Sequence, residues 1–153
     1  MRLLDFLRPE MIWVALESDS KQDSLKGLVD RVVERQVVQE AGTLLEALWA
    51  REHIVTTGIG RGIAIPHADL PEITHPQLAL GVYPAGVDFD ALDDQLVHLV
   101  FMLLGTPRTP GLHMKILARI ARLSKDPDLC QDLIKATEPH VAIEILRRTE
   151  QRH

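Results

Sequence analysis

The sequence predicts an α/β protein, a single domain over residues 1–153 whose mixed β-sheet is flanked by helices on both faces. Three observations lead to this prediction. Short apolar runs typical of strands alternate with segments whose apolar residues recur every three or four positions, as in amphipathic helices. The run at 96–104 is apolar on both alternating faces, which indicates a central strand covered on both sides. The chain has the length of one ordinary domain, and no repeat or linker divides it.

The first third of the chain predicts one strand and two helices. The apolar run at 11–16 is too short for a helix and ends in the polar cluster ESDSKQDS, so we expect a strand there. Apolar residues at helical spacing up to residue 33 then predict an amphipathic helix of about four turns, with Ser20 as its N-cap. The pattern resumes after residues 42–43 and fades at 51–53, which predicts a second helix.

The rest of the chain predicts a loop, three strands and three helices. Residues 56–62 hold three glycines in five positions, which excludes a regular helix and predicts a loop. Strand-like segments follow at 63–65, 78–83 and 96–104. A cluster of threonine, proline and glycine at 106–111 ends the strands. Helical patterns complete the chain at 116–123, 129–134 and 141–146.

Charge and composition narrow the functional classes. A formal net charge of -5 supplies no general positive field for a polyanion, so we expect no nucleic-acid partner. The lone Cys130 cannot form an intramolecular disulfide, which favours a reducing compartment. The N-terminal segment is interrupted by charged residues and a proline, and the longest apolar run is far shorter than the roughly 20 residues of a spanning helix. We therefore expect a cytoplasmic protein without direct membrane insertion.

The residues best suited to chemistry centre on His67. Pro66 restricts the backbone just before it, so the imidazole should be presented at the end of a strand. A neutral imidazole is a nucleophile at cytoplasmic pH and can form a phosphoramidate. The roughly two negative charges of a phosphoryl group then need donors. Candidates are the glycine N–H groups, the guanidinium fork of Arg51, and His113, which lies on the inward-facing stripe of its predicted helix.

Each of these residues also has a plain structural interpretation. Taken alone, His67 after a proline would be structural, Arg51 a solvated helix residue, and His113 a capping or packing residue. His98, inside an apolar strand, is expected to be a core histidine. The glycine loop matches neither common nucleotide-binding pattern, and a metal site built on His67 and His113 would need further ligands at suitable spacing. We therefore expect neither a metal nor a cofactor.

The order of these residues resembles a known family. R-E-x-x-x-x-T-G-I-G-x-G-I-A-I-P-H, which ends at His67, closely resembles the active-site signature of the type-2 enzyme IIA family (fructose, mannitol and nitrogen-regulatory) of the bacterial phosphotransferase system. L-H-M-K-I-L-A-R-I-A-R-L at 112–123 resembles its second histidine motif, and residues 86–104 look like its strand pair. The resemblance runs from about residue 10 to residue 148. The segment T-P-R-T-P-G before His113 departs from it in its prolines.

The resemblance implies a phosphotransferase that acts through a phosphohistidine, or a purely regulatory relative of one. His67 would accept a phosphoryl group from the histidine-containing phosphocarrier protein, His113 would stabilise that group, and Arg51 would stabilise it or dock the donor. Two outputs stay open. A stand-alone nitrogen-regulatory enzyme IIA would act on a regulatory target protein, and the chain's lack of a fused domain slightly favours it. A sugar-specific enzyme IIA would pass the phosphoryl group to the EIIB domain of a sugar permease.

Overall fold

The computed structural model describes residues 1–153 and contains one six-stranded mixed sheet. The strands are β1 (Ile12–Trp13), β2 (Gly58–Gly60), β3 (Ile63–Ala64), β4 (His67–Asp69), β5 (Gln77–Val87) and β6 (Val97–Gly105). Their order is β1-β5-β6-β3-β2, and β4 also pairs with β6. β5 runs antiparallel to β6, whereas β3 and β4 run parallel to it. β6 therefore pairs with three other strands, β3, β4 and β5.

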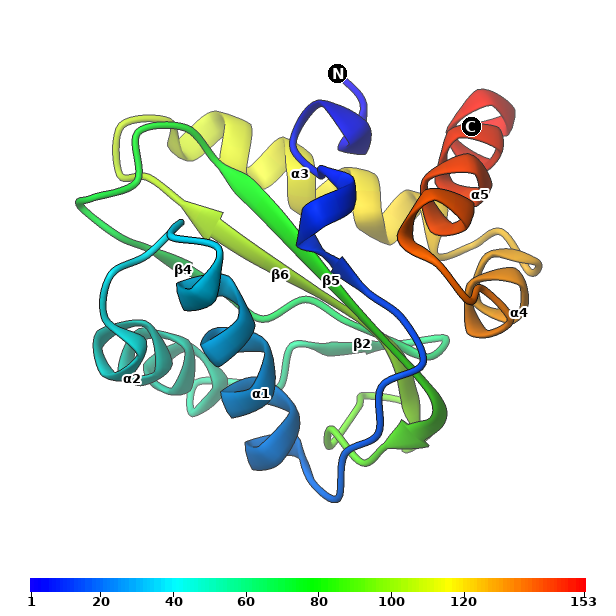
Figure 1. Ribbon diagram of the computed structural model, residues 1–153, viewed down its shortest axis with the longest axis horizontal. Coiled ribbons are helices and arrows are strands. Elements are labelled where there is room, and N and C mark those ends of the chain that lie inside the picture. Colours follow the sequence, from blue (N-terminus) through cyan, green and yellow to red (C-terminus); the bar gives the residue numbers. More distant parts are fainter.

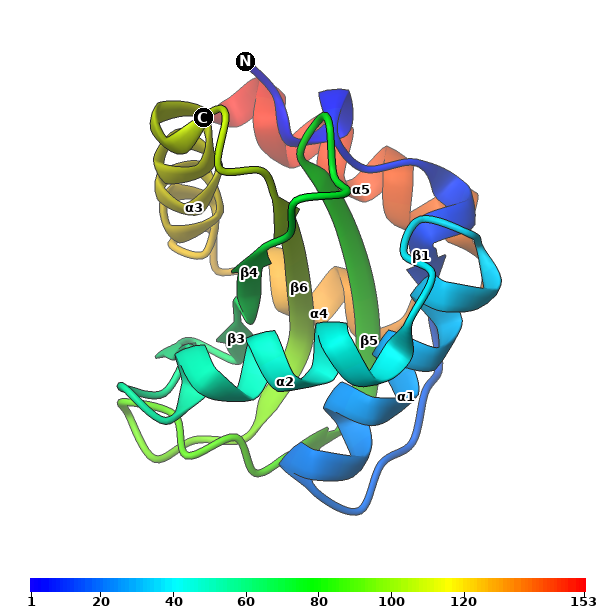
Figure 2. The same ribbon diagram turned by 90° about the vertical axis from the view of Figure 1, so that its left-hand side faces the viewer.

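Helices cover both faces of this sheet. They are α1 (Lys21–Glu34), α2 (Ala41–Glu52), α3 (Pro110–Leu123), α4 (Leu129–Ile134) and α5 (Pro139–Arg152). α1 and α2 lie on one side of the sheet, and α3, α4 and α5 lie on the other (Figures 1 and 2). The predicted α/β class, with a mixed sheet flanked by helices on both faces, is confirmed. None of the helices combines the length and the apolar character that crossing a membrane requires.

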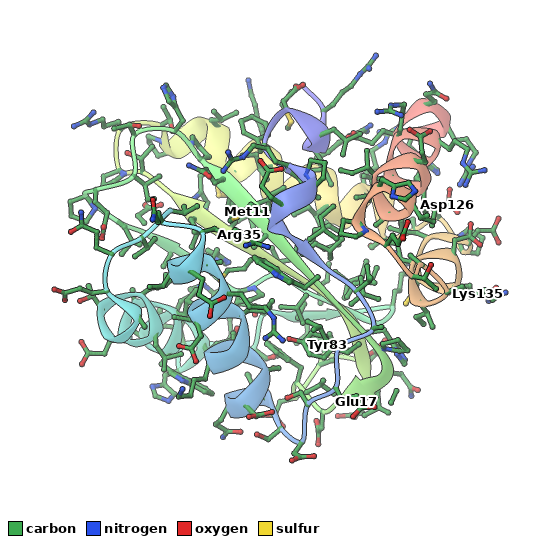
Figure 3. All side chains as sticks on the ribbon, viewed as in Figure 1. Met11, Glu17, Arg35, Tyr83, Asp126 and Lys135 are labelled. Carbon is green, nitrogen blue, oxygen red and sulfur yellow. The ribbon has the colours of Figure 1, made fainter.

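The core is built around β6. Every residue of this strand except His98 is buried, as expected for a central strand covered on both sides. The strand belongs to a cluster of 41 buried hydrophobic residues. Tyr83 reaches from β5 toward α1, where its hydroxyl donates to the carbonyl of Ser24 at 3.4 Å (Figure 3). His98 is half-buried, and its Nδ1 lies 3.1 Å from the Tyr83 carbonyl, so it is a partnered structural histidine.

The shortest elements differ from the sequence prediction. The strand expected at 11–16 is reduced to β1, because residues Pro9–Met11 form a 3-10 turn and Ala15 has a φ of 55°. The glycine stretch expected as a loop contains β2, which turns tightly into the antiparallel β3 through Arg61 and two glycines with positive φ. The predicted N-cap of α1 is confirmed, since Ser20 Oγ accepts from the Asp23 N–H at 3.0 Å.

Candidate functional site

His67 begins β4 rather than ending β3. The chain continues past Pro66 as a further strand in which His67 is paired with Leu103 of β6. The carbonyl of Pro66 accepts a hydrogen bond from the Leu103 N–H at 2.9 Å, which fixes the peptide group that leads into His67. The imidazole is half-buried. The expectation that His67 lies at the end of a strand is wrong, because β3 ends at Ala64 and His67 begins β4, where pairing with β6 continues the chain as a strand.

The contacts of the His67 ring define which nitrogen is free to react. Nδ1 lies 2.8 Å from the carbonyl oxygen of Ile65, which can only accept, so Nδ1 carries the proton. Nε2 then keeps its lone pair and accepts a hydrogen bond from Nε of Arg51 at 3.2 Å. The hydrogen-bond partners thus assign the tautomer. In it, Nε2 is the nucleophilic nitrogen.

Burial is the main cause that lowers the pKa of His67 below its usual 6.5, and the nearby Arg51 and His113 lower it further. The hydrogen bond to the Ile65 carbonyl and the charge of Glu52 act in the opposite direction without reversing the shift. A lowered pKa keeps the imidazole neutral at neutral pH. A neutral ring is the form that can attack an electrophile.

Arg51 lies in the last turn of α2 and is fixed at two points. Its Nη1 donates to the carbonyl of Val55 at 2.8 Å, and its Nε donates to His67. The bond to Val55 ties the segment that follows α2 to the guanidinium of Arg51. The remaining N–H groups of the fork therefore stand beside Nε2 of His67 in a restrained orientation, where they could contact an anion.

His113 is the third predicted residue, and the structure brings it to the same place. It lies near the start of α3, it is buried, and its ring meets that of His67 edge to face, with centroids 5.2 Å apart and planes at 65°. The N-terminus of α3 carries the positive end of the helix dipole, which favours negative charge nearby. The proline-rich segment before His113 forms a turn and the start of α3. Thr106 Oγ1 accepts from the Arg108 N–H at 3.3 Å, and Pro110 is the first residue of the helix.

Two acidic residues of the site were missed by the sequence analysis. The Asp69 carboxylate lies two residues after His67 on β4, and its Oδ1 is 3.2 Å from Nδ1 of His113, within ion-pair range but without the alignment of a straight hydrogen bond. The Glu52 carboxylate is buried below the glycine loop and accepts from both the N–H and the hydroxyl of Thr57. The i, i+2 spacing on a strand was the available signal for Asp69. For Glu52, the available signal was its position directly after Arg51 in the R-E motif.

A lysine completes the buried cluster under the loop. Lys21 Nζ lies 2.8 Å from Glu52 Oε2, with the two side chains only 10% and 1% exposed, and 4.9 Å from the centroid of the Phe89 ring. Glu52 thereby links the start of α1, the end of α2 and the loop that leads into β2. This cluster holds the loop against the helix that carries Arg51.

A shallow cavity of about 340 Å³ opens beside His67. Its walls are mainly apolar and come from the glycine loop, the end of β3 and one face of α3: Ile59, Ile65, Met114, Leu117, Ala118 and Ala121. Met114 is 65% exposed at the rim. This apolar surface surrounds the polar ring of His67. No group of three or more His, Cys, Asp or Glu side chains is arranged to hold a metal ion.

Comparison with known proteins identifies the family. Residues 5–149 match the family described as the phosphoenolpyruvate-dependent sugar phosphotransferase system, EIIA 2. The chain therefore belongs to the type-2 enzyme IIA family of the phosphotransferase system, as the resemblance implied. Membership in this family implies phosphotransfer through a histidine in general.

The relatives divide between two branches. The chain is 34% identical over 146 residues to a nitrogen regulatory protein of Bradyrhizobium diazoefficiens, with 95% of each protein covered. It is 31% identical over 137 residues to the fructose-specific EIIA component of Haloferax volcanii, with coverage of 90% and 89%. It is also 30% identical to a fructose-specific EIIABC component of Bacillus subtilis, of which it spans 23% of the length.

Solved structures share the fold. The nitrogen regulatory protein IIA-Ntr of Neisseria meningitidis superposes with a TM-score of 0.85 at 27% identity, covering 93% of this chain and 97% of that one. The mannitol enzyme IIA of Escherichia coli, in a complex with phosphorylated enzyme IIB, superposes with a TM-score of 0.77 at 19% identity, covering 94% and 99%. The second likeness concerns the fold alone.

Proposed function

We propose that this chain is a phosphocarrier that accepts a phosphoryl group on Nε2 of His67 from a histidine-containing phosphocarrier protein and passes it to another protein. The observation that carries this proposal is the state of the His67 ring. Its Nδ1–H is engaged by the Ile65 carbonyl, its lowered pKa keeps it neutral, and its Nε2 lone pair lies next to Arg51. This is a nucleophile already in its reactive tautomer.

The transfer step balances without a proton shuttle. The Nε2 lone pair attacks phosphorus, the bond between phosphorus and the donor nitrogen breaks, and the donor imidazole leaves with that electron pair. His67 keeps the proton on Nδ1, so its ring becomes positively charged next to the dianionic phosphoryl group. The Ile65 carbonyl, 2.8 Å from Nδ1, accepts from the charged ring and stabilises it. Onward transfer is the same step in reverse with a different acceptor.

Arg51 and His113 serve the phosphoryl oxygens in this proposal. Arg51 releases Nε2 when phosphorus binds there and offers its N–H groups to the oxygens, while its bond to Val55 keeps the guanidinium in place. His113 donates from a ring whose centroid is 5.2 Å from that of His67, and its protonated form is favoured once the negative charge has arrived. It is a hydrogen-bond donor and not the nucleophile.

The test is phosphorylation with phosphoenolpyruvate and the general phosphotransferase proteins of a characterised bacterium. The wild-type chain should gain one acid-labile phosphoryl group with the ³¹P signature of a phosphoramidate. His67→Ala should gain none. His75→Ala is the matched control, because His75 is an exposed histidine outside the site, and it should be labelled like the wild type. Normal labelling of His67→Ala would place the acceptor elsewhere and refute the proposal.

We further propose that the output is regulatory, as in the nitrogen-related branch. In support, a nitrogen regulatory protein matches over 95% of both chains at 34% identity. The second candidate is a sugar-specific enzyme IIA, supported by the fructose-specific EIIA relative and by the mannitol enzyme IIA solved with phosphorylated enzyme IIB. Mixing the phosphorylated chain with isolated fructose- and mannitol-type EIIB domains separates the two, since rapid transfer to either would support the sugar-specific output.

A further inference from the structure

The carboxylate of Asp69 is placed to act on His113 rather than on His67. Asp69 and His67 lie two residues apart on β4 and so project from the same side of the strand. Asp69 Oδ1 approaches Nδ1 of His113 to 3.2 Å. Nδ1 is completely buried and has no aligned hydrogen-bond partner. The carboxylate is the polar group within ion-pair range of that nitrogen, which would otherwise be buried without compensation.

The backbone opposite this pair is a glycine, and the reason is space. Gly105 is the register partner of Asp69 on β6. A Cβ at Gly105 would lie closer than 3.0 Å to both Asp69 Oδ1 and His113 Nδ1, nearer than real Cβ contacts allow. Its φ is not in the left-handed region, so another residue could adopt this backbone. The missing side chain therefore leaves room for the two groups to meet.

We propose that Asp69, opposite Gly105, is the positioning residue that sets the tautomer and the charge of His113 for the reaction at His67. The inference rests on the proposed function and adds a residue to it. With the Nδ1 proton directed to Asp69, the other ring nitrogen, Nε2, is left to serve the site. When a phosphoryl group is on His67, His113 stands between two negative groups, the phosphoryl oxygens and the Asp69 carboxylate, and both favour a proton from solvent on its second ring nitrogen.

The charges that face His113 support this arrangement. The neutral His67 ring contacts it edge to face, and the Arg51 cation lies beyond that ring, next to Nε2. The Arg51 cation opposes a positive charge on His113 before phosphorylation, whereas the Asp69 carboxylate favours it. A phosphoryl group adds negative charge on the His67 side and tips the balance toward the imidazolium. Because Asp69 is 44% exposed, its contribution is moderated by solvent.

Two substitutions of Asp69 separate its charge from its hydrogen-bonding capacity. Asp69→Asn keeps a polar oxygen near Nδ1 but removes the charge, so His113 should keep its tautomer and lose imidazolium character in the phosphorylated protein. Asp69→Ala removes both. The readout is the imidazole ¹⁵N spectrum of histidine-labelled protein before and after phosphorylation. Asp19→Asn, at an exposed aspartate in the loop before α1, is the matched control.

Transfer rates and Gly105→Ala complete the test. We expect phosphorylation of His67 to slow by roughly threefold to tenfold in Asp69→Asn and more in Asp69→Ala, the modest size reflecting the partial exposure of Asp69. Gly105→Ala should displace the pair and reproduce the ¹⁵N change with both side chains present. Gly42→Ala, where a Cβ meets nothing within 4 Å, controls for the substitution, and circular dichroism checks the fold.

The outcomes distinguish this inference from the proposed function. A wild-type chain that accepts no phosphoryl group would refute the function and the role of Asp69 with it. If the wild type is labelled, unchanged His113 ¹⁵N signals in Asp69→Ala overturn the inference alone. Faster phosphorylation of Asp69→Asn would also overturn it, because the carboxylate would then act only by repelling the incoming phosphoryl group.

Discussion

Glu52 offers a stringent test of how the fold supports the site. Its carboxylate is 1% exposed and accepts from Thr57 twice and from Lys21 Nζ at 2.8 Å. Glu52→Gln keeps the shape and an acceptor for Thr57, but it leaves the ammonium of Lys21, 10% exposed, without its counter-charge. The carboxylate of Asp90 lies 4.0 Å from Nζ and is 80% exposed, so it compensates weakly.

Breaking a buried ion pair from one side costs about 3–5 kcal/mol. We expect Glu52→Gln to lower the free energy of unfolding by about 3 kcal/mol, at the low end because Asp90 and the Phe89 ring remain near the ammonium. Lys21→Met combined with Glu52→Gln removes the stranded charge and should recover more than half of this loss. Because Lys21→Met alone also costs stability by stranding the Glu52 carboxylate, the coupling energy between the two substitutions should exceed about 1.5 kcal/mol.

The measurement is urea unfolding of the four proteins of this cycle, followed by circular dichroism. Glu46→Gln is the control, since Glu46 is an exposed glutamate on the same helix, and surface changes of this kind stay within about 0.5 kcal/mol. Additive effects, with Glu52→Gln costing less than about 1 kcal/mol, would refute the argument. A folded Glu52→Gln protein should also accept phosphate more slowly, because Thr57 lines the cavity beside His67.

The remaining predictions concern Arg51, His67 and His113, the three residues that we propose surround the phosphoryl group. Arg51→Lys should slow transfer in a folded protein because lysine cannot make the bidentate contact, and a wild-type rate would make Arg51 a surface residue. The acid limb of the pH–rate profile should lie below pH 6.5, since burial and Arg51 lower the pKa of His67; replacing Arg51 by Met should move that limb to higher pH. His113→Ala should still label on His67, but with transfer weakened by about 1.5–3 kcal/mol, as measured by quench-flow.

The long elements were accessible from the sequence because they carry periodic signals. α1 shows both its apolar stripe and its Ser20 cap, and β6 shows an apolar run that only a doubly covered strand tolerates. β2, β3 and β4 have two or three residues each, too few to show a period, and they exist because β6 and the tight glycine turn hold them. Whether such short segments form strands is decided by pairing with distant strands and not by their own sequence pattern.

The candidate site shows the same division. His67, Arg51 and His113 were selected by a motif resemblance, and the structure brings all three together, while their roles stay proposals. The i, i+2 spacing places Asp69 on the side of β4 that carries His67, but its approach to His113 could not be predicted, because it depends on how α3 sits over the sheet. Glu52 stands beside Arg51 in the motif, but its contacts with Lys21 and Thr57 are set by the packing of three separate segments.

The register of one short strand links the fold to the chemistry. β4 is paired with β6 so that His67 faces Leu103 and Asp69 faces Gly105. A slip of one residue would turn both side chains to the opposite face of the sheet, away from Arg51 and His113. Three residues of pairing alone could not prevent this slip. The buried Ala68 between them, the Pro66 carbonyl bonded to Leu103, and the space at Gly105 together favour a single register. The same contacts that place His67 therefore also place the Asp69 carboxylate beside His113.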